Sequence, residues 1–184
     1  MTLVLASRSP QRQAILERLG VEFVVRPTDV DELEQGDPPV VALENALRKA
    51  TALTPPAGDL VLGVDTIVAL DGVVYGKPQS AADAVRTLQA LAGRTHTVIS
   101  GVALLAADAP PLLCTESTAV TFRELDQRLI DWYVAGGEWQ GRSGGYAIQQ
   151  RGGVLVRRIE GDYTNVVGLP VGALLDLCPS LLDT

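Results

Sequence analysis

The chain has 184 residues, 47% of them hydrophobic and 20% charged, which suits one soluble domain over residues 1–184 with a sizeable core. The net charge of -7 argues against a surface that wraps nucleic acid, and no apolar stretch is long enough to span a membrane. Cys114 and Cys178 have no metal-ligand partner at short spacing, so we expect two small buried hydrophobic residues in a cytoplasmic protein.

The first segment indicates an anion site. Residues 2–6 form a short apolar strand, and Ser9 as N-cap with Pro10 at the first helical position begins a helix that Gly20 ends. Arg8 and Arg12 stand at the start of this helix. Free backbone N–H groups, hydroxyls and guanidinium groups together suit a phosphate. The alternative is an ordinary capped helix with solvated arginines.

An acidic loop follows a predicted strand at residues 23–26. Asp29, Asp31 and Glu32 lie close together in this loop. Neighbouring carboxylates are ligands that Mg²⁺ prefers, although acidic loops are usually just solvated.

A helix is predicted over residues 39–53. We expect Val40, Leu43, Leu47 and Ala50 to form its buried face. Lys49 lies off this stripe, so the pattern alone predicts a surface lysine.

Residues 61–78 predict a hairpin with a charge at the edge of the core. Two apolar runs flank Asp71-Gly72, a strong two-residue turn signal. Asp65 stands alone among apolar neighbours, and a buried carboxylate needs a cation, a metal or donors nearby. We expect the pairing to break at Gly76, which frees Lys77 to reach the same pocket. The alternative is an edge hairpin whose aspartate caps a neighbouring loop.

The remaining chain predicts mixed helices and strands. Ser80 and Asp83 form a capping box for a helix that Gly93 ends, and further elements follow: strands at residues 94–104 and 112–122, a helix at 126–134, strands at 154–159 and 163–167, and a helix from 170. His96, the single histidine, is expected to be a hydrogen-bonded strand residue, which leaves no His-rich metal site.

Residues 136–153 are too rich in glycine for a regular element. Trp139, Arg142, Tyr146 and Gln149 in this segment are suited to stacking on a ring and hydrogen-bonding it. A flexible surface hairpin is the alternative.

The order of elements predicts a mixed α/β fold, with hairpins on a twisted sheet flanked by helices. Strict βαβ alternation is absent, which disfavours a doubly wound fold. The sequence also lacks GxGxxG after its first strand and GxxxxGK[ST], which excludes dinucleotide-binding and P-loop sites.

Several spaced motifs together resemble the Maf family of nucleoside triphosphate pyrophosphatases: LASRSPQR at the N-terminus, LGVDTIV at residues 62–68, GKP at 76–78, GRTHTVISGVAL at 93–104, GGYAIQQRGG at 144–153 and YTNVVGLP at 163–170. The resemblance implies a homodimer with an inosine-triphosphate-pyrophosphatase-like fold: an elongated mixed sheet with a central cleft. It also implies Mg²⁺- or Mn²⁺-dependent cleavage of a nucleoside triphosphate to the monophosphate and pyrophosphate.

The resemblance also implies roles for individual residues. Asp65 matches the family's proton acceptor, and Glu32 its acidic metal-site position. The phosphate-binding positions correspond to Ser7, Arg12, Lys49 and Lys77, with Arg142 where a lysine is usual. Thr66 and Gln149 match positions tied to base choice and resemble the branch that acts on dTTP and UTP. Gln11, a third specificity position, replaces that branch's arginine.

Our hypothesis from the residues is that Asp65, with Glu32, holds the metal and takes the proton from the attacking water. Two alternatives stay open. One is a pyrophosphatase for modified or methylated nucleotides, and the other is a non-catalytic nucleotide-binding regulator of cell division.

Overall fold

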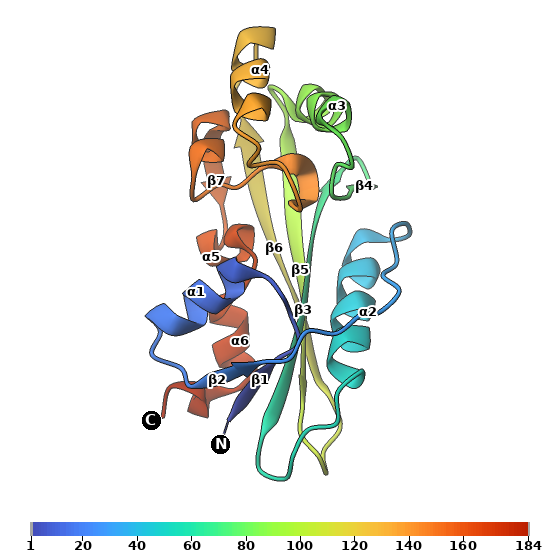
Figure 1. Ribbon diagram of the computed structural model, residues 1–184, viewed down its shortest axis with the longest axis vertical. Helices are drawn as coiled ribbons and strands as arrows, with labels where there is room; N and C mark the ends of the chain where they lie inside the picture. The colour runs from blue at the N-terminus through green and yellow to red at the C-terminus, as the bar shows by residue number, and fades with distance from the viewer. Residues whose placement is uncertain (1, 184) are drawn as a thin grey trace.

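The computed structural model describes residues 2–183, which form an elongated mixed sheet with helices on both faces (Figure 1). The strand order is β2-β1-β3-β5-β6-β7, and β4 pairs with β3. Within the described residues the seven strands are β1 (Leu3–Leu5), β2 (Phe23–Val25), β3 (Leu60–Leu70), β4 (Val73–Tyr75), β5 (Thr95–Leu105), β6 (Leu112–Phe122) and β7 (Val156–Glu160).

Helices cover the sheet in three groups. In Figure 1, α2 lies on one side of the long strands, α1, α5 and α6 lie on the other, and α3 and α4 lie at one end. Their bounds are α1 (Pro10–Arg18), α2 (Pro38–Thr51), α3 (Ala81–Leu91), α4 (Gln127–Ala135), α5 (Tyr163–Val167) and α6 (Val171–Leu177), with 3-10 turns η1 (Ser143–Gly145), η2 (Arg151–Leu155) and η3 (Pro179–Leu182). No helix between residues 2 and 183 is long and apolar enough to cross a membrane.

The pairing of β3 leaves a gap that positions the site. β1 runs parallel to β3 and pairs with residues 60–62, whereas β4 is antiparallel and pairs with residues 68–70. On its other edge β3 pairs with β5 from Val61 to Ala69. Residues 63–67 of β3 therefore have one open edge, and Asp65 and Thr66 lie there.

Alternating side chains of the strands build separate cores on the two faces. Leu3 and Leu5 pack with residues of α1 and α6, whereas Val4 between them packs with Ala46 and Ala50 of α2. This two-residue period is what a sheet buried on both faces requires. The expected mixed sheet with flanking helices is confirmed.

The local start and turn signals form as predicted. Ser9 caps α1 through a hydrogen bond from the Arg12 N–H, and Ser80 accepts one from the Asp83 N–H at 3.1 Å. At the hairpin turn, Asp71 and Gly72 have φ angles of 52° and 77°, the left-handed values that a tight two-residue turn needs.

The predicted buried face of one helix and the predicted type of one element are wrong. The buried face of α2 consists of Val41, Ala42, Asn45, Ala46, Lys49 and Ala50, and Val40 is 58% exposed. The residues at 163–167 form the helix α5 and not a strand. Asp162 caps this helix by accepting the Thr164 N–H at 2.7 Å, and this local bond outweighs the strand propensity of the β-branched residues.

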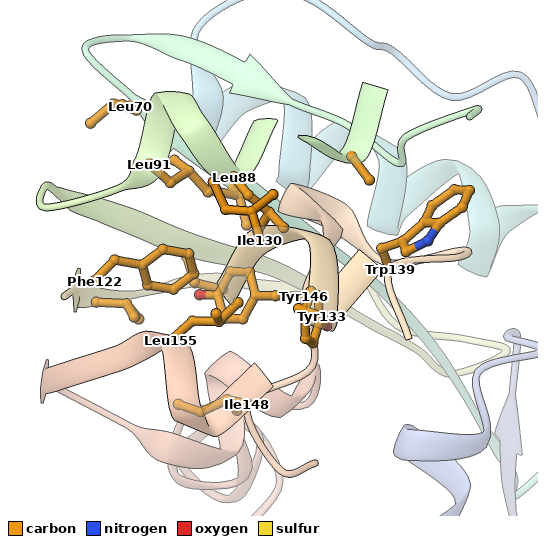
Figure 2. Close-up of a cluster of buried hydrophobic side chains, with 14 residues drawn as sticks. Leu70, Leu88, Leu91, Phe122, Ile130, Tyr133, Trp139, Tyr146, Ile148 and Leu155 are labelled. Atoms are coloured by element: carbon orange, nitrogen blue, oxygen red, sulfur yellow. The ribbon is translucent and has the colours of Figure 1, made fainter. Parts of the chain in front are cut away.

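The glycine-rich segment has 3-10 turns but no α-helix or strand, as expected, yet its aromatic rings do not stand free. Trp139 and Tyr146 lie in the hydrophobic cluster that Figure 2 shows, together with side chains of α3 and α4. The Trp139 indole donates to the Val134 carbonyl at 3.0 Å. The prediction that Trp139 stacks on a ligand ring is therefore wrong.

Cys178 is buried as predicted, whereas Cys114 is only half-buried.

Candidate functional site

A cleft of about 590 Å³ opens along the free edge of β3. Its walls come from the start of α1, the loop before α2, the segment after β4, residues 140–143 and the end of α5. Five basic side chains line the cleft: Arg8, Arg12, Lys49, Lys77 and Arg142. Three acidic side chains also line it: Asp29, Glu32 and Asp65. Basic groups therefore predominate here in a chain of net charge -7.

Lys49 joins two carboxylates at the centre of this cleft. Its Nζ lies 2.5 Å from Asp65 Oδ1 and 2.8 Å from Glu32 Oε1. The Lys49 and Asp65 side chains are only 11% and 7% exposed. Lys77 Nζ lies 3.5 Å from Glu32 Oε2, and its side chain is 49% exposed. Lys77 thus reaches the pocket from the end of the hairpin, as predicted.

The prediction that Lys49 is a surface residue is wrong, because α2 lies unusually close to the sheet. A Cβ atom at Gly63 would come within 2.1 Å of the Ala46 carbonyl oxygen, and one at Gly101 within 2.3 Å of the Ala42 oxygen. Bare glycines facing small alanines bring the helix down, and Lys49 then meets Asp65. A buried ammonium group is tolerated because carboxylates surround it.

Glu32 is held in its charged form. Partial burial by itself raises the pKa of its carboxyl, but hydrogen bonding and charge from Lys49 and Lys77 outweigh that effect, so the pKa of Glu32 is lowered. A carboxylate that stays ionised beside Asp65 is suited to binding a cation.

Arg12 is buried and largely fixed by the protein. Its Nε donates to the Gly168 carbonyl at 2.8 Å, its Nη1 to Ser7 Oγ at 2.9 Å and its Nη2 to Thr66 Oγ1 at 3.2 Å. Burial lowers the pKa of Arg12, while Asp65 and Glu32 oppose this. A guanidinium has five N–H donors, so two remain for a ligand.

The glycine-rich segment holds Arg142 at the rim. Ser143 Oγ donates to the Thr66 carbonyl at 2.7 Å, and the Gly144 N–H donates to the Gly76 carbonyl at 3.1 Å. Gly144 has a φ of 67° and packs against Val68, where a side chain would clash. Arg142 Nε is buried and has no hydrogen-bond partner among residues 2–183, so its N–H is free to donate to an anionic ligand.

The three expected base-choice positions are dispersed. Gln11 lines the cleft, and its Oε1 accepts from Ser9 Oγ at 3.1 Å. Thr66 also lines the cleft, but its hydroxyl lies 2.8 Å from Ser100 Oγ and accepts from Arg12. Gln149 is exposed and lies outside the described lining of the cleft. Gln11 is therefore the position of the three whose side chain is best placed to meet a ligand.

His96 is a hydrogen-bonded strand residue, as predicted. Its Nε2 lies 2.8 Å from the Tyr146 hydroxyl, and its ring makes an edge contact with Phe122. Burial lowers the pKa of His96 to about 4, so the imidazole is neutral at physiological pH. Tyr146 in turn lines the cleft, so His96 supports one wall of it.

Sequence reasoning missed Asn45, which contacts Asp65. Its Nδ2 donates to Asp65 Oδ2 at 3.1 Å, so each carboxylate oxygen of Asp65 has a donor. The available signal was spacing: Asn45 lies one helical turn before Lys49 and shares its face.

The two carboxylates also suit a divalent cation. Oxygens of Glu32 and Asp65 converge on one ammonium group, and hard carboxylate oxygens are the donors that Mg²⁺ and Mn²⁺ prefer. Within the described chain no three His, Cys, Asp or Glu side chains form a complete metal-binding group. The acidic pair therefore fits a metal that takes its other ligands from substrate phosphates and water, as Mg²⁺ commonly does.

The fold and the cleft together define an α/β protein in which basic side chains surround a buried carboxylate. A family model described as "Maf-like protein" matches residues 2–181, and the chain belongs to that family.

Relatives match over most of their length. A "dTTP/UTP pyrophosphatase" of Moorella thermoacetica is 50% identical over 173 residues, which cover 92% of this chain and 89% of the relative. One of the same name from Symbiobacterium thermophilum is 46% identical over 172 residues, with 92% and 88% covered. Among solved structures, a HAM1 protein from Coxiella burnetii aligns with a TM-score of 0.51 and 20% identity, covering 84% of this chain and 91% of that one. This last likeness supports the fold alone.

Proposed function

We propose that this protein is a nucleoside triphosphate pyrophosphatase that hydrolyses dTTP and UTP to the monophosphate and pyrophosphate. It acts as one domain over residues 1–184, as a cytoplasmic homodimer, and with Mg²⁺ or Mn²⁺. Membership of the Maf family and the names of the relatives support the reaction and the substrates. The homodimer rests on the family resemblance, and the cytoplasmic location rests on the composition and the cysteines of the sequence.

One observation supports the chemistry above all others: a buried carboxylate, Asp65, lies beside Glu32 in a cleft that five basic side chains line. A polyphosphate needs many cationic contacts, and in-line attack on phosphorus needs a positioned water. Both features together favour hydrolysis of a polyphosphate.

The phosphates bind through the start of α1 and the basic side chains around it. Arg12 offers its two free N–H groups, and Ser7 sets its orientation. Lys77, just after β4, and Arg142, in the glycine-rich segment, also line the cleft. These contacts stabilise the charge that accumulates on pyrophosphate as it leaves.

Asp65 takes the proton from the attacking water. Lys49 and Asn45 each donate to one of its oxygens and hold the carboxylate in place. When bound by Asp65 and Glu32, a divalent cation supplies charge neutralisation at the phosphates and lowers the pKa of a coordinated water. Lys49 keeps the two carboxylates together before substrate arrives.

Gln11, which lines the cleft, and the backbone at residues 144–148, of which Tyr146 lines the cleft, select the base. A side-chain amide offers one donor and one acceptor, which matches a pyrimidine edge. Leaving such groups unpaired against a wrong base costs about 1–3 kcal/mol. Gln149 remains a proposed specificity residue, although it would have to turn inward to touch the base.

The test is pyrophosphate release by the purified protein with Mg²⁺ or Mn²⁺, with orthophosphate measured in parallel. We expect pyrophosphate from dTTP and UTP and little from GTP. Release mainly from a methylated nucleotide would favour the pyrophosphatase for modified nucleotides. Nucleotide binding without any product would instead favour the non-catalytic regulator.

Asp65→Asn is the matched variant for the assay, because the amide keeps the shape of the carboxylate and loses its charge. We expect turnover to fall by about 100-fold or more, since general-base catalysis contributes about that much. Circular dichroism should show that the variant is folded. An active Asp65→Asn variant would contradict the assignment of Asp65 as the base.

A further inference from the structure

Asn45 is a fully buried amide whose one role in the reaction outlined above is to donate to Asp65. It is 1% exposed on the face of α2 that packs on the sheet. Burying an amide without partners costs about 1–3 kcal/mol, so its contacts require a reason. Its neighbours on this face, Ala42 and Ala46, are the small apolar residues that such a position ordinarily takes.

The contacts of Asn45 join two separate parts of the site. Asn45 Oδ1 accepts the Leu33 N–H at 2.7 Å, and Nδ2 donates to the Leu33 carbonyl at 3.0 Å and to Asp65 Oδ2 at 3.1 Å. The Leu33 N–H can only donate, so it fixes which atom of the amide is oxygen. The same amide therefore holds the backbone next to Glu32 and one oxygen of Asp65.

The loop at residues 26–37 depends on such tethers, because it contains neither helix nor strand. Arg48 Nη1 donates to the Asp31 carbonyl at 2.9 Å, and Lys49 pairs with Glu32 at 2.8 Å. Asn45, Arg48 and Lys49 lie at i, i+3 and i+4 on one side of α2. One side of α2 thus fixes the backbone at Leu33 and Asp31 and the side chain of Glu32.

We propose that Asn45 is a positioning residue that fixes the separation of the Glu32 and Asp65 carboxylates and so builds the divalent-cation site. This inference rests on the proposed metal-assisted function and adds a residue that acts through the two acidic side chains. Partners that orient metal-binding carboxylates typically affect metal affinity by about 10–100-fold.

The test measures Mn²⁺ binding to the nucleotide-free protein by electron paramagnetic resonance of the free ion. Hydrogen exchange of the peptide at residues 27–36 is measured on the same samples. Asn45→Leu keeps the size of the side chain and removes all three hydrogen bonds. We expect its Mn²⁺ dissociation constant to rise about 10–100-fold and the loop peptide to exchange faster.

Arg48→Leu is the matched control, since it releases the same loop at Asp31 but touches neither Glu32 nor Asp65. We expect faster loop exchange with Mn²⁺ affinity close to wild type. Should Asn45→Leu fail to fold, Asn45→Ser carries the same expectation, because its short hydroxyl cannot span Leu33 and Asp65. Mn²⁺ affinity within about twofold of wild type in the folded Asn45 variant would overturn the proposal. Neither readout needs nucleotide turnover, so a failure of the proposed function is recognised separately.

Discussion

Replacing Lys49 by methionine removes a buried cation and keeps most of the apolar stem. Asp65 is then left with the Asn45 amide as its remaining side-chain donor in the described structure. Breaking a buried ion pair by removing one partner costs about 3–5 kcal/mol, because an uncompensated charge stays buried. We expect Lys49→Met to lower the free energy of unfolding by about that amount.

A double-mutant cycle isolates the pair from other effects of the substitution. In an Asp65→Asn background there is no buried charge left to compensate at that position, so Lys49→Met should cost much less. The expected coupling energy is about 2–3 kcal/mol, measured by urea unfolding at neutral pH. Lys77→Met is the matched control, since Lys77 pairs with Glu32 at 3.5 Å from an exposed position and should contribute about 0–1 kcal/mol. Additive costs of Lys49→Met and Asp65→Asn would refute the reasoning.

Three further outcomes follow from the structure. Between pH 6.5 and 4 the unfolded chain binds a proton at His96, whereas the buried imidazole of the folded protein stays neutral. The free energy of unfolding of wild type should therefore fall by about 3 kcal/mol over this range. His96→Gln should not show this loss, and urea unfolding at several pH values measures it. Gly101→Ala should lower the free energy of unfolding by about 1–3 kcal/mol, measured by chemical denaturation, and should reduce turnover. The added Cβ would push α2 and Lys49 away from the sheet. Excess EDTA should abolish pyrophosphate release while the nucleotide-free protein stays folded by circular dichroism, because Lys49 and Asn45 hold the Asp65 carboxylate without a metal.

Each of these outcomes has a contradicting result. Equal pH dependence in wild type and His96→Gln would show that His96 does not control acid stability. Gly172→Ala is the control for Gly101→Ala, since nothing lies within 4 Å of its Cβ position, and equal costs for the two would exclude close helix approach as the cause. Turnover that persists in EDTA would show that the reaction does not require a divalent metal.

Local signals in the sequence were sufficient for several elements. Ser9 and Pro10 begin α1, Asp71 and Gly72 turn the hairpin, and Ser80 caps α3, because each signal acts within a few residues. The need of Asp65 for nearby partners was also predictable, since a lone charge in an apolar strand requires them.

Most of the wrong predictions concern positions whose structure depends on residues far away in the sequence. Lys49 is buried because Gly63 and Gly101, far away in the sequence, let α2 approach the sheet, and periodicity within the helix cannot reveal this. The face of α2 was misassigned for the same reason, and Asn45 was missed with it. Residues 163–167 are the exception, because the cap at Asp162 that makes them helical is local and outweighs their strand propensity.

The aromatic residues of the glycine-rich segment show a related limit. Composition does not distinguish a ring that binds a ligand from one that fills a core, and Trp139 does the latter. Arg142 and Tyr146 do line the cleft, because Gly144 lets the backbone lie against β3. Side-chain direction here follows from backbone angles that the sequence alone leaves open.

Hydrolysis of dTTP in water enriched with oxygen-18 tests the central claim most directly, because it reports which phosphorus the water attacks. Attack at the α-phosphorus, with Asp65 as base, places one solvent oxygen in the monophosphate and leaves pyrophosphate unlabelled. We expect mass spectrometry to find that pattern. Label in pyrophosphate, or orthophosphate as the product, would contradict the account.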